Sequence, residues 1–146
     1  MLRISKLTDY GTVVMAYLAS HPETGHAATE IAEQTNIALP TVSKLLKLLA
    51  RNKFLVAQRG AKGGYSLALP AKDISLAQIV HALEGDIALT TCGHQHGICA
   101  METRCAIRNN WRLISDVIYE TLSGISLLQM ISPIKTQQVK TKLAVL

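Results

Sequence analysis

Three cysteines are the residues of this sequence whose type and spacing point most clearly to chemistry. Cys92, Cys99 and Cys105 lie within 14 residues, with the spacing C-x6-C-x5-C. Thiolates are soft ligands that select zinc, copper(I) or iron–sulfur clusters, and an odd number of clustered cysteines fits ligand or redox chemistry better than a disulfide framework. The spacing alone favours zinc and an iron–sulfur cluster equally. Three thiolates need a fourth ligand, and the chain offers Asp9, His94, His96 and Arg108.

The segments around the cysteines are expected to be a loop followed by a helix. Residues 86–104 show little hydrophobic periodicity, which indicates a loop. Cys105 is expected to begin a long helix that ends near Ser123, with Gly124 just beyond it, and the helix dipole would favour the thiolate there. Apolar residues recur along this helix at spacings of 4, 3, 4 and 4 residues, as in helices that pair with a partner helix. The sequence therefore predicts a homodimer held by Ile107, Trp111, Ile114, Ile118 and Leu122.

A second feature with chemical meaning is a basic stretch in the first half of the chain. The formal net charge is +5, and the segment from Asn36 to Gly63 holds six basic residues and no acidic one. Such a concentration of positive charge is typical of a nucleic-acid-binding surface. On charge alone, an ordinary solvated basic surface is an equally good explanation.

The elements expected around the basic stretch follow the order of a winged helix-turn-helix. Helices are predicted over 8–20, 29–34 and from Leu39, with a left-handed turn at Asn36 and Pro40 in the first turn of the third helix. A β-hairpin over 54–69 with a glycine-rich tip and a helix over 74–83 come next. The fold class predicted is mainly α with a small hairpin wing. The first helix should bury a stripe made of Tyr10, Val13, Val14, Tyr17 and Leu18.

The third helix has two faces that suit DNA recognition. Its apolar stripe, Val42, Leu45, Leu46 and Leu49, should anchor it to the other helices, which leaves its polar face for the major groove. Cations of the hairpin tip could reach the neighbouring minor groove. The residues predicted to contact double-stranded DNA are Pro40, Thr41, Ser43, Lys44, Lys47, Arg51, Arg59 and Lys62.

The chain divides into four parts on these criteria. We expect a winged helix-turn-helix domain over 1–85, a cysteine-containing loop over 86–105, a dimerisation helix and short helix over 106–132, and a mobile tail over 133–146. No apolar run is long enough for a membrane span and no signal peptide is evident, so a cytoplasmic protein is expected. No nucleophile or acid–base constellation indicates an enzyme. A small iron–sulfur electron carrier or metal-storage protein would leave the basic stretch unexplained.

The sequence resembles the Rrf2 family of bacterial transcription regulators over residues 1 to about 132. The matching motifs are Leu7-Thr8-Asp9-Tyr10, Leu39-Pro40-Thr41-Val42-Ser43-Lys44, the wing from Gln58 to Tyr65, Ala82-Leu83-Glu84-Gly85, and the three cysteines followed by Asn110-Trp111. Taken together and in order, these motifs are highly specific. Within the family, the start Ser5-Lys6-Leu7-Thr8-Asp9-Tyr10 is most similar to regulators of the SUF iron–sulfur assembly system.

The resemblance implies a [2Fe-2S] or [4Fe-4S] cluster on Cys92, Cys99 and Cys105. One sibling regulator uses a histidine three residues after the last cysteine as fourth ligand, but Arg108 stands there. Another uses an aspartate from the first helix of the partner subunit, and Asp9 matches that position, so Asp9 is the preferred fourth ligand. The function implied is a homodimeric repressor of iron–sulfur assembly genes at a palindromic site. The alternatives are a nitric-oxide or redox-responsive regulator of other genes and a winged-helix repressor that holds zinc.

Overall fold

The computed structural model describes residues 3–23, 25–60, 63–90, 99 and 104–132. Within these residues the fold is mainly helical, with a two-stranded antiparallel sheet, as the sequence predicts. None of the helices in this part of the chain is long and apolar enough to cross a membrane. The elements are α1 (Lys6–Ser20), α2 (Ala28–Thr35), α3 (Leu39–Arg51), β1 (Leu55–Gln58), β2 (Gly64–Leu67), the 3-10 helix η1 (Ala71–Asp73), α4 (Leu76–Glu84), α6 (Arg108–Ser123) and α7 (Leu127–Met130).

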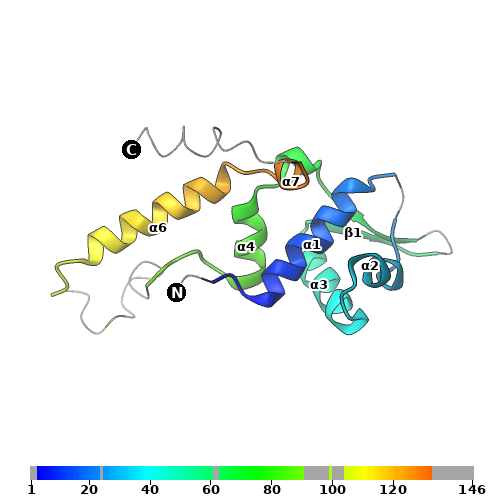
Figure 1. Ribbon diagram of the computed structural model, residues 1–146, viewed down its shortest axis with the longest axis horizontal. Helices are drawn as coiled ribbons and strands as arrows, with labels where there is room; N and C mark the ends of the chain where they lie inside the picture. The colour runs from blue at the N-terminus through cyan, green and yellow to red at the C-terminus, as the bar shows by residue number, and fades with distance from the viewer. Residues whose placement is uncertain (1–2, 24, 61–62, 91–98, 100–103, 133–146) are drawn as a thin grey trace.

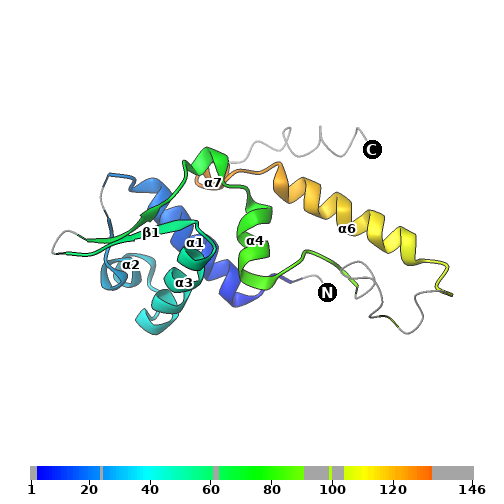
Figure 2. The ribbon, with the colours of Figure 1, turned by 180° about the vertical axis from the view of Figure 1, so that it is seen from behind.

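The elements form a compact body from which one helix extends. Helices α1, α2 and α3 and the β1–β2 hairpin make up one end of the molecule (Figure 1). Helix α4 packs beside α1, and α6 runs away from the body on the other side of α4, as both views show (Figure 2). The long helix is thus joined to the winged body at one end and projects from it at the other.

The helix boundaries follow local capping and turn chemistry. Helix α1 begins two residues before the predicted start because the Ser5 hydroxyl accepts a hydrogen bond from the Thr8 amide over 3.2 Å. Helix α2 ends at Asn36, which has φ of 54°, and this confirms the predicted left-handed turn. Pro40 lies in the first turn of α3, where a missing amide hydrogen costs little. Asn36 and Pro40 thus bound the short turn between α2 and α3.

The core confirms the apolar stripe of α3 and corrects that of α1. Val42, Leu45, Leu46 and Leu49 are each 0% exposed. In α1, Val14 and Leu18 are buried as predicted and Tyr10 and Tyr17 pack partly against the core, but Val13 is 41% exposed. The other buried residues of α1 are Thr8, Gly11 and Met15. The buried face is rotated because α1 packs against α2, α3, α4 and α7 together, and a stripe read from one period cannot indicate contacts on several sides.

A backbone pairing fixes the end of α6 to the start of α4. The Leu76 amide donates to the Ile125 carbonyl and the Leu127 amide to the Ile74 carbonyl, both over 2.8 Å. On either side of this pairing Ser75 and Ser126 cap α4 and α7, each through a capping box with a glutamine three residues later. The carboxyl end of α6 is therefore held firmly on the winged body.

The long helix begins later than predicted. Helix α6 starts at Arg108, and Cys105 lies in the turn before it. The Cys105 carbonyl accepts a hydrogen bond from the Arg108 amide over 3.4 Å. The first-turn position expected for Cys105 is therefore wrong, because hydrophobic periodicity locates a helix but not its first residue. Gly124 directly follows the last residue of α6, as predicted, and with φ of −80° it leads into the turn before α7.

Candidate nucleic-acid interface and cysteine segment

The outer face of α3 presents cations on a rigid support. Pro40, Lys44, Lys47 and Arg51 are exposed, whereas Thr41 and Ser43 are half-buried. The opposite face is the fully buried stripe described above, so the helix cannot rotate without exposing its core side chains. The described chain from Asn36 to Gly60 has no acidic side chain to offset these charges. This arrangement suits insertion of α3 into the major groove.

The hairpin places a further cation beside α3. Strands β1 and β2 pair in the register Leu55 with Leu67 through Gln58 with Gly64, and Arg59 is exposed where β1 ends. Gly60 has φ of 119°, a conformation that side chains disfavour. Lys62, also predicted to contact DNA, lies outside the described residues.

A polar cluster around His26, between the helices and the hairpin, was not predicted from the sequence. His26 is only 6% exposed, with its Nδ1 2.8 Å from Glu30 Oε1 and its Nε2 2.9 Å from the His21 carbonyl oxygen. The Tyr17 hydroxyl donates to the same Glu30 oxygen over 3.1 Å. Two pairs spaced four residues apart in the sequence, Tyr17 with His21 and His26 with Glu30, are the signal that could have revealed this cluster.

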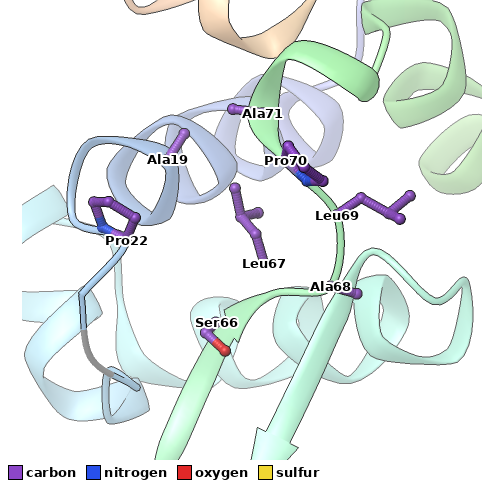
Figure 3. Close-up of a pocket in the computed structure, with 8 residues that line it drawn as sticks. All are labelled: Ala19, Pro22, Ser66, Leu67, Ala68, Leu69, Pro70 and Ala71. Atoms are coloured by element: carbon purple, nitrogen blue, oxygen red, sulfur yellow. The ribbon is translucent and has the colours of Figure 1, made fainter.

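Two surface hollows flank the body without the composition of a catalytic site. One, of about 380 Å³, lies between the end of α1 and β2, and its lining of alanine, proline, leucine and serine carries no charge (Figure 3). The other, of about 500 Å³, lies between the chain before α1, helix α4, the segment 85–89 and α6. Its walls include Val80, Ile118 and Leu122, with Arg3 and Glu84 at the edges. Neither hollow holds a nucleophile paired with a base.

The cysteine segment is described only in part. Cys99 and Cys105 are free, half-buried thiols, while Cys92, His94 and His96 lie outside the described residues. Asp9 is exposed in the first turn of α1. Within the described part of one chain, Asp9, Cys99 and Cys105 do not gather into a metal-binding group. The two thiols are donors of the type that iron–sulfur clusters and zinc use, so the donor chemistry fits such a group while its ligand set needs further residues.

Helix α6 leaves apolar side chains on the surface. Of the five residues predicted to form a dimer seam, Ile107 and Ile114 are 56% and 43% exposed, and Trp111, Ile118 and Leu122 are half-buried. Leu113 and Tyr119, which the seam did not include, are 62% and 49% exposed. Ile118 and Leu122 are partly covered because they face the hollow beside α4. The segment 107–119 thus carries more apolar surface than a solvated helix needs.

Comparisons with known proteins agree with this architecture. The family model Rrf2, described as an iron-dependent transcriptional regulator, matches residues 4–133. The HTH-type transcriptional regulator IscR of Photorhabdus laumondii is 30% identical over 132 residues, which cover 90% of this chain and 80% of the relative.

Two solved structures share the fold of the whole described chain. CymR, the global cysteine regulator of B. subtilis, has a TM-score of 0.73 at 28% identity, covering 92% of this chain and 100% of CymR. IscR of T. potens has a TM-score of 0.71 at 27% identity, covering 94% of this chain and 91% of that protein. These proteins are regulators and not enzymes. With its winged helix-turn-helix body, its cationic α3 and a match over nearly its full length, the chain belongs to the Rrf2 family of DNA-binding transcriptional regulators.

Proposed function

We propose that this regulator represses iron–sulfur assembly genes and that a bound iron–sulfur cluster controls its affinity for DNA. The observation that carries the proposal is the family match to iron-dependent regulators in a chain whose three cysteines lie, in the sequence, between α4 of the winged body and the projecting helix. DNA binding itself rests on the family and on the cationic face of α3. The cluster, the sign of regulation and the target genes are the proposed parts.

Two copies of the chain are proposed to act together. Pairing of the projecting α6 helices would cover Ile107, Leu113 and Ile114, which are exposed in one chain. A two-fold symmetric dimer presents two recognition helices to DNA, and a palindromic site with half-sites about one helical turn apart matches that symmetry.

Cys92, Cys99 and Cys105 are the residues proposed to hold the cluster, with Asp9 of a second copy as fourth ligand. When bound, the cluster supplies a sensor that iron, oxygen or nitric oxide can alter. The segment 85–90 lies against α6, because the Leu89 amide donates to the buried Ser115 hydroxyl over 3.2 Å. Cys105 stands at the free end of α6, whose other end is anchored to α4. Changes at the cysteines would therefore bear on the helix that sets the spacing of the two α3 helices.

A second candidate function is a thiol- or redox-responsive repressor of other genes. The similarity to CymR favours it, because this chain matches a global cysteine regulator as well as it matches an IscR. A zinc-holding repressor uses the same thiol donors. The state of the three cysteines separates these candidates.

The experiment is purification without oxygen, followed by visible spectroscopy, iron and sulfide analysis and measurement of affinity for promoter DNA before and after oxygen exposure. We expect a coloured protein with stoichiometric iron and sulfide whose DNA affinity changes when the cluster is lost. Asp9→Ala should lower cluster content or make it more labile, while Asp116→Ala, at an exposed acid of α6, is the matched control.

The outcomes distinguish the candidates. Colourless protein containing zinc would favour the zinc repressor, and metal-free protein with oxidation-sensitive DNA binding would favour the thiol-responsive one. A coloured Asp9→Ala variant with unchanged cluster content and lability would remove Asp9 from the ligand set. Metal-free protein that binds DNA equally well in either state would overturn the sensor proposal and leave a plain repressor.

A further inference from the structure

His26 lies where α1, α2 and the β1–β2 hairpin meet. It stands between the end of α1 and the start of α2, and its backbone pairs with β2 of the wing. The His26 amide donates to the Tyr65 carbonyl over 3.0 Å, and the Tyr65 amide donates to the His26 carbonyl over 2.8 Å. The wing is therefore fastened to the helical body at the residue whose side chain is a buried imidazole.

The contact between His26 and the wing is close. Gly64 has φ of 154°, and a Cβ atom at this position would come within 2.6 Å of the His26 carbonyl carbon and oxygen. Gly25 meets the same strand, with Gly64 atoms 3.3 to 3.4 Å from where its Cβ would be. The position of β2 therefore depends directly on where the loop around His26 lies.

Both ring nitrogens of His26 face groups that can only accept a hydrogen bond from it. Nδ1 lies 2.8 Å from a Glu30 carboxylate oxygen and Nε2 lies 2.9 Å from the His21 carbonyl oxygen. A neutral imidazole has one N–H, whereas the imidazolium has two. Only the charged ring donates to both acceptors, and the neutral ring leaves a nitrogen lone pair against an oxygen lone pair. The two contacts are therefore both satisfied only when His26 is protonated.

The charged and titratable groups around His26 agree with this state. Glu30 of α2 contacts the ring, Tyr17 of α1 and His21 lie beside it with ring centroids at 5.2 and 5.9 Å, and Glu23 shares a hollow of about 220 Å³ with it. Burial lowers the pKa of His26, but hydrogen bonds with Glu30 and the His21 carbonyl and the charge of Glu30 outweigh it and raise the pKa above 6.5. The hydrogen bond from His26 is the largest influence on Glu30, and it lowers the pKa of this carboxyl although burial acts in the opposite direction; the Tyr17 hydrogen bond and the charge of His26 lower it further.

We propose that His26 is a proton-dependent positioning residue for the wing. As an imidazolium, His26 donates hydrogen bonds both to Glu30 of α2 and to the His21 carbonyl at the end of α1. These two bonds hold in place the loop that pairs with β2. When His26 loses its proton, one of the two hydrogen bonds is lost, the loop loosens and the wing is held less well. DNA affinity therefore falls as the pH rises. This inference rests on DNA binding by α3 and the wing and is independent of any cluster.

The sign of the effect follows from the two pKa shifts. His26 has a raised pKa, so its contribution is complete below about 6.5 and is lost as the pH rises through the folded value. Glu30 has a lowered pKa, so its contribution is present above its usual value of 4.5 and is lost only in more acidic solution. The hydrogen bonds that hold the wing are therefore complete between about pH 4.5 and about pH 6.5, and they weaken as the solution becomes alkaline.

The test is the pH dependence of DNA affinity at constant ionic strength, with a duplex selected for binding from a random-sequence pool. From about pH 6 to about pH 9 we expect the dissociation constant to rise roughly threefold to tenfold, since the net contribution of a typical intramolecular hydrogen bond has that order of effect on an equilibrium. His26→Gln should remove this rise. Glu30→Gln should move the midpoint to lower pH. The control is His81→Gln, because His81 lies exposed on α4, paired with Asp86 at 3.1 Å, and should keep the wild-type profile.

A second measurement needs no variant and so does not depend on a variant folding. Nuclear magnetic resonance titration of the wild-type protein should give one midpoint, above 6.5, for the His26 ring and for the amides of β2. The proposal is overturned if His26→Gln keeps the wild-type pH profile. It is equally overturned if the β2 amides do not shift at the midpoint of His26.

Discussion

At the scale of single residues, the most consequential pair is Lys44 and Lys47. Both lysines are exposed on α3, on the face away from the buried Leu45 and Leu46. Packing of these leucines in the core therefore fixes where the two lysines lie, while their charges face solvent. A lysine at the surface of a recognition helix binds DNA chiefly by neutralising phosphate charge and releasing counterions. Such contacts add affinity without sequence preference.

Replacement of these lysines should therefore change the salt dependence of binding. For Lys44→Ala and Lys47→Ala, the slope of log affinity against log salt should become shallower by about one for each phosphate that is no longer neutralised, and affinity should fall for every duplex sequence alike. The measurement is fluorescence anisotropy over a series of salt concentrations. Lys72→Ala, at an exposed lysine of η1 outside α3 and the wing, should leave the slope unchanged. Equal slopes for all the proteins would place the phosphate-binding residues elsewhere.

At the scale of the elements, the pairing between the start of α4 and the end of α6 is the main joint of the molecule. Its backbone hydrogen bonds join residues about fifty positions apart. Each side of the joint is capped by a serine, so the amides that begin α4 and α7 are satisfied where the chain turns. A weaker cap at this joint loosens the support of α6 as well as α4.

The cap of α4 can be tested by one hydroxyl deletion. Ser75→Ala removes the acceptor for the Gln78 amide, which it meets at 3.2 Å, and should lower the free energy of unfolding by about 1 kcal/mol. Chemical denaturation followed by circular dichroism measures this decrease. Ser123→Ala is the control, because Ser123 is exposed in the last turn of α6 and caps no helix start. Similar decreases for both variants would contradict the capping explanation.

At the scale of the whole molecule, the projecting α6 helix carries uncovered apolar surface. Ser115 is the only buried residue of α6. Four large apolar side chains of this segment are exposed instead: Ile107, Leu113, Ile114 and Tyr119. Within the described residues of one chain these side chains stay uncovered, because α4 and the segment 85–90 lie on the side of Ser115, Ile118 and Leu122. In the proposed dimer, a second copy of the helix would cover these side chains.

A charge placed in the exposed seam should separate the subunits. Ile114→Glu buries a carboxylate in any α6 pairing, so we expect a monomer in analytical ultracentrifugation. DNA affinity should then fall about a hundredfold or more, because the two half-sites would no longer be bound by one linked particle. Ser123→Glu adds the same charge at an exposed position on the opposite face of α6 from Ile114, and this variant should remain dimeric. A dimeric Ile114→Glu protein would show that the seam lies elsewhere.

Much of this protein was determined by local sequence alone. The order of helices, the turn at Asn36, the first-turn Pro40 and the fully buried stripe of α3 were all predicted correctly, because they depend on periodicity and on the conformational preferences of single residues. The capping of α4 by Ser75 belongs to the same class. The family resemblance rested on motifs and was confirmed by the comparison. The DNA-contact set, the dimer seam and the cluster ligands were also named from sequence, and they stay predictions.

Only the tertiary structure decided the features that depend on several elements at once. The buried face of α1 was predicted only in part, with Val13 wrongly included, because several other elements share its contacts. The start of α6 was misplaced because no side-chain cap marks it. The pairing between the start of α4 and the end of α6 involves residues that meet only in the folded chain, and so does the His26 cluster. Their energies come from hydrogen bonds that exist only after the helices have packed, so no local pattern could reveal their geometry.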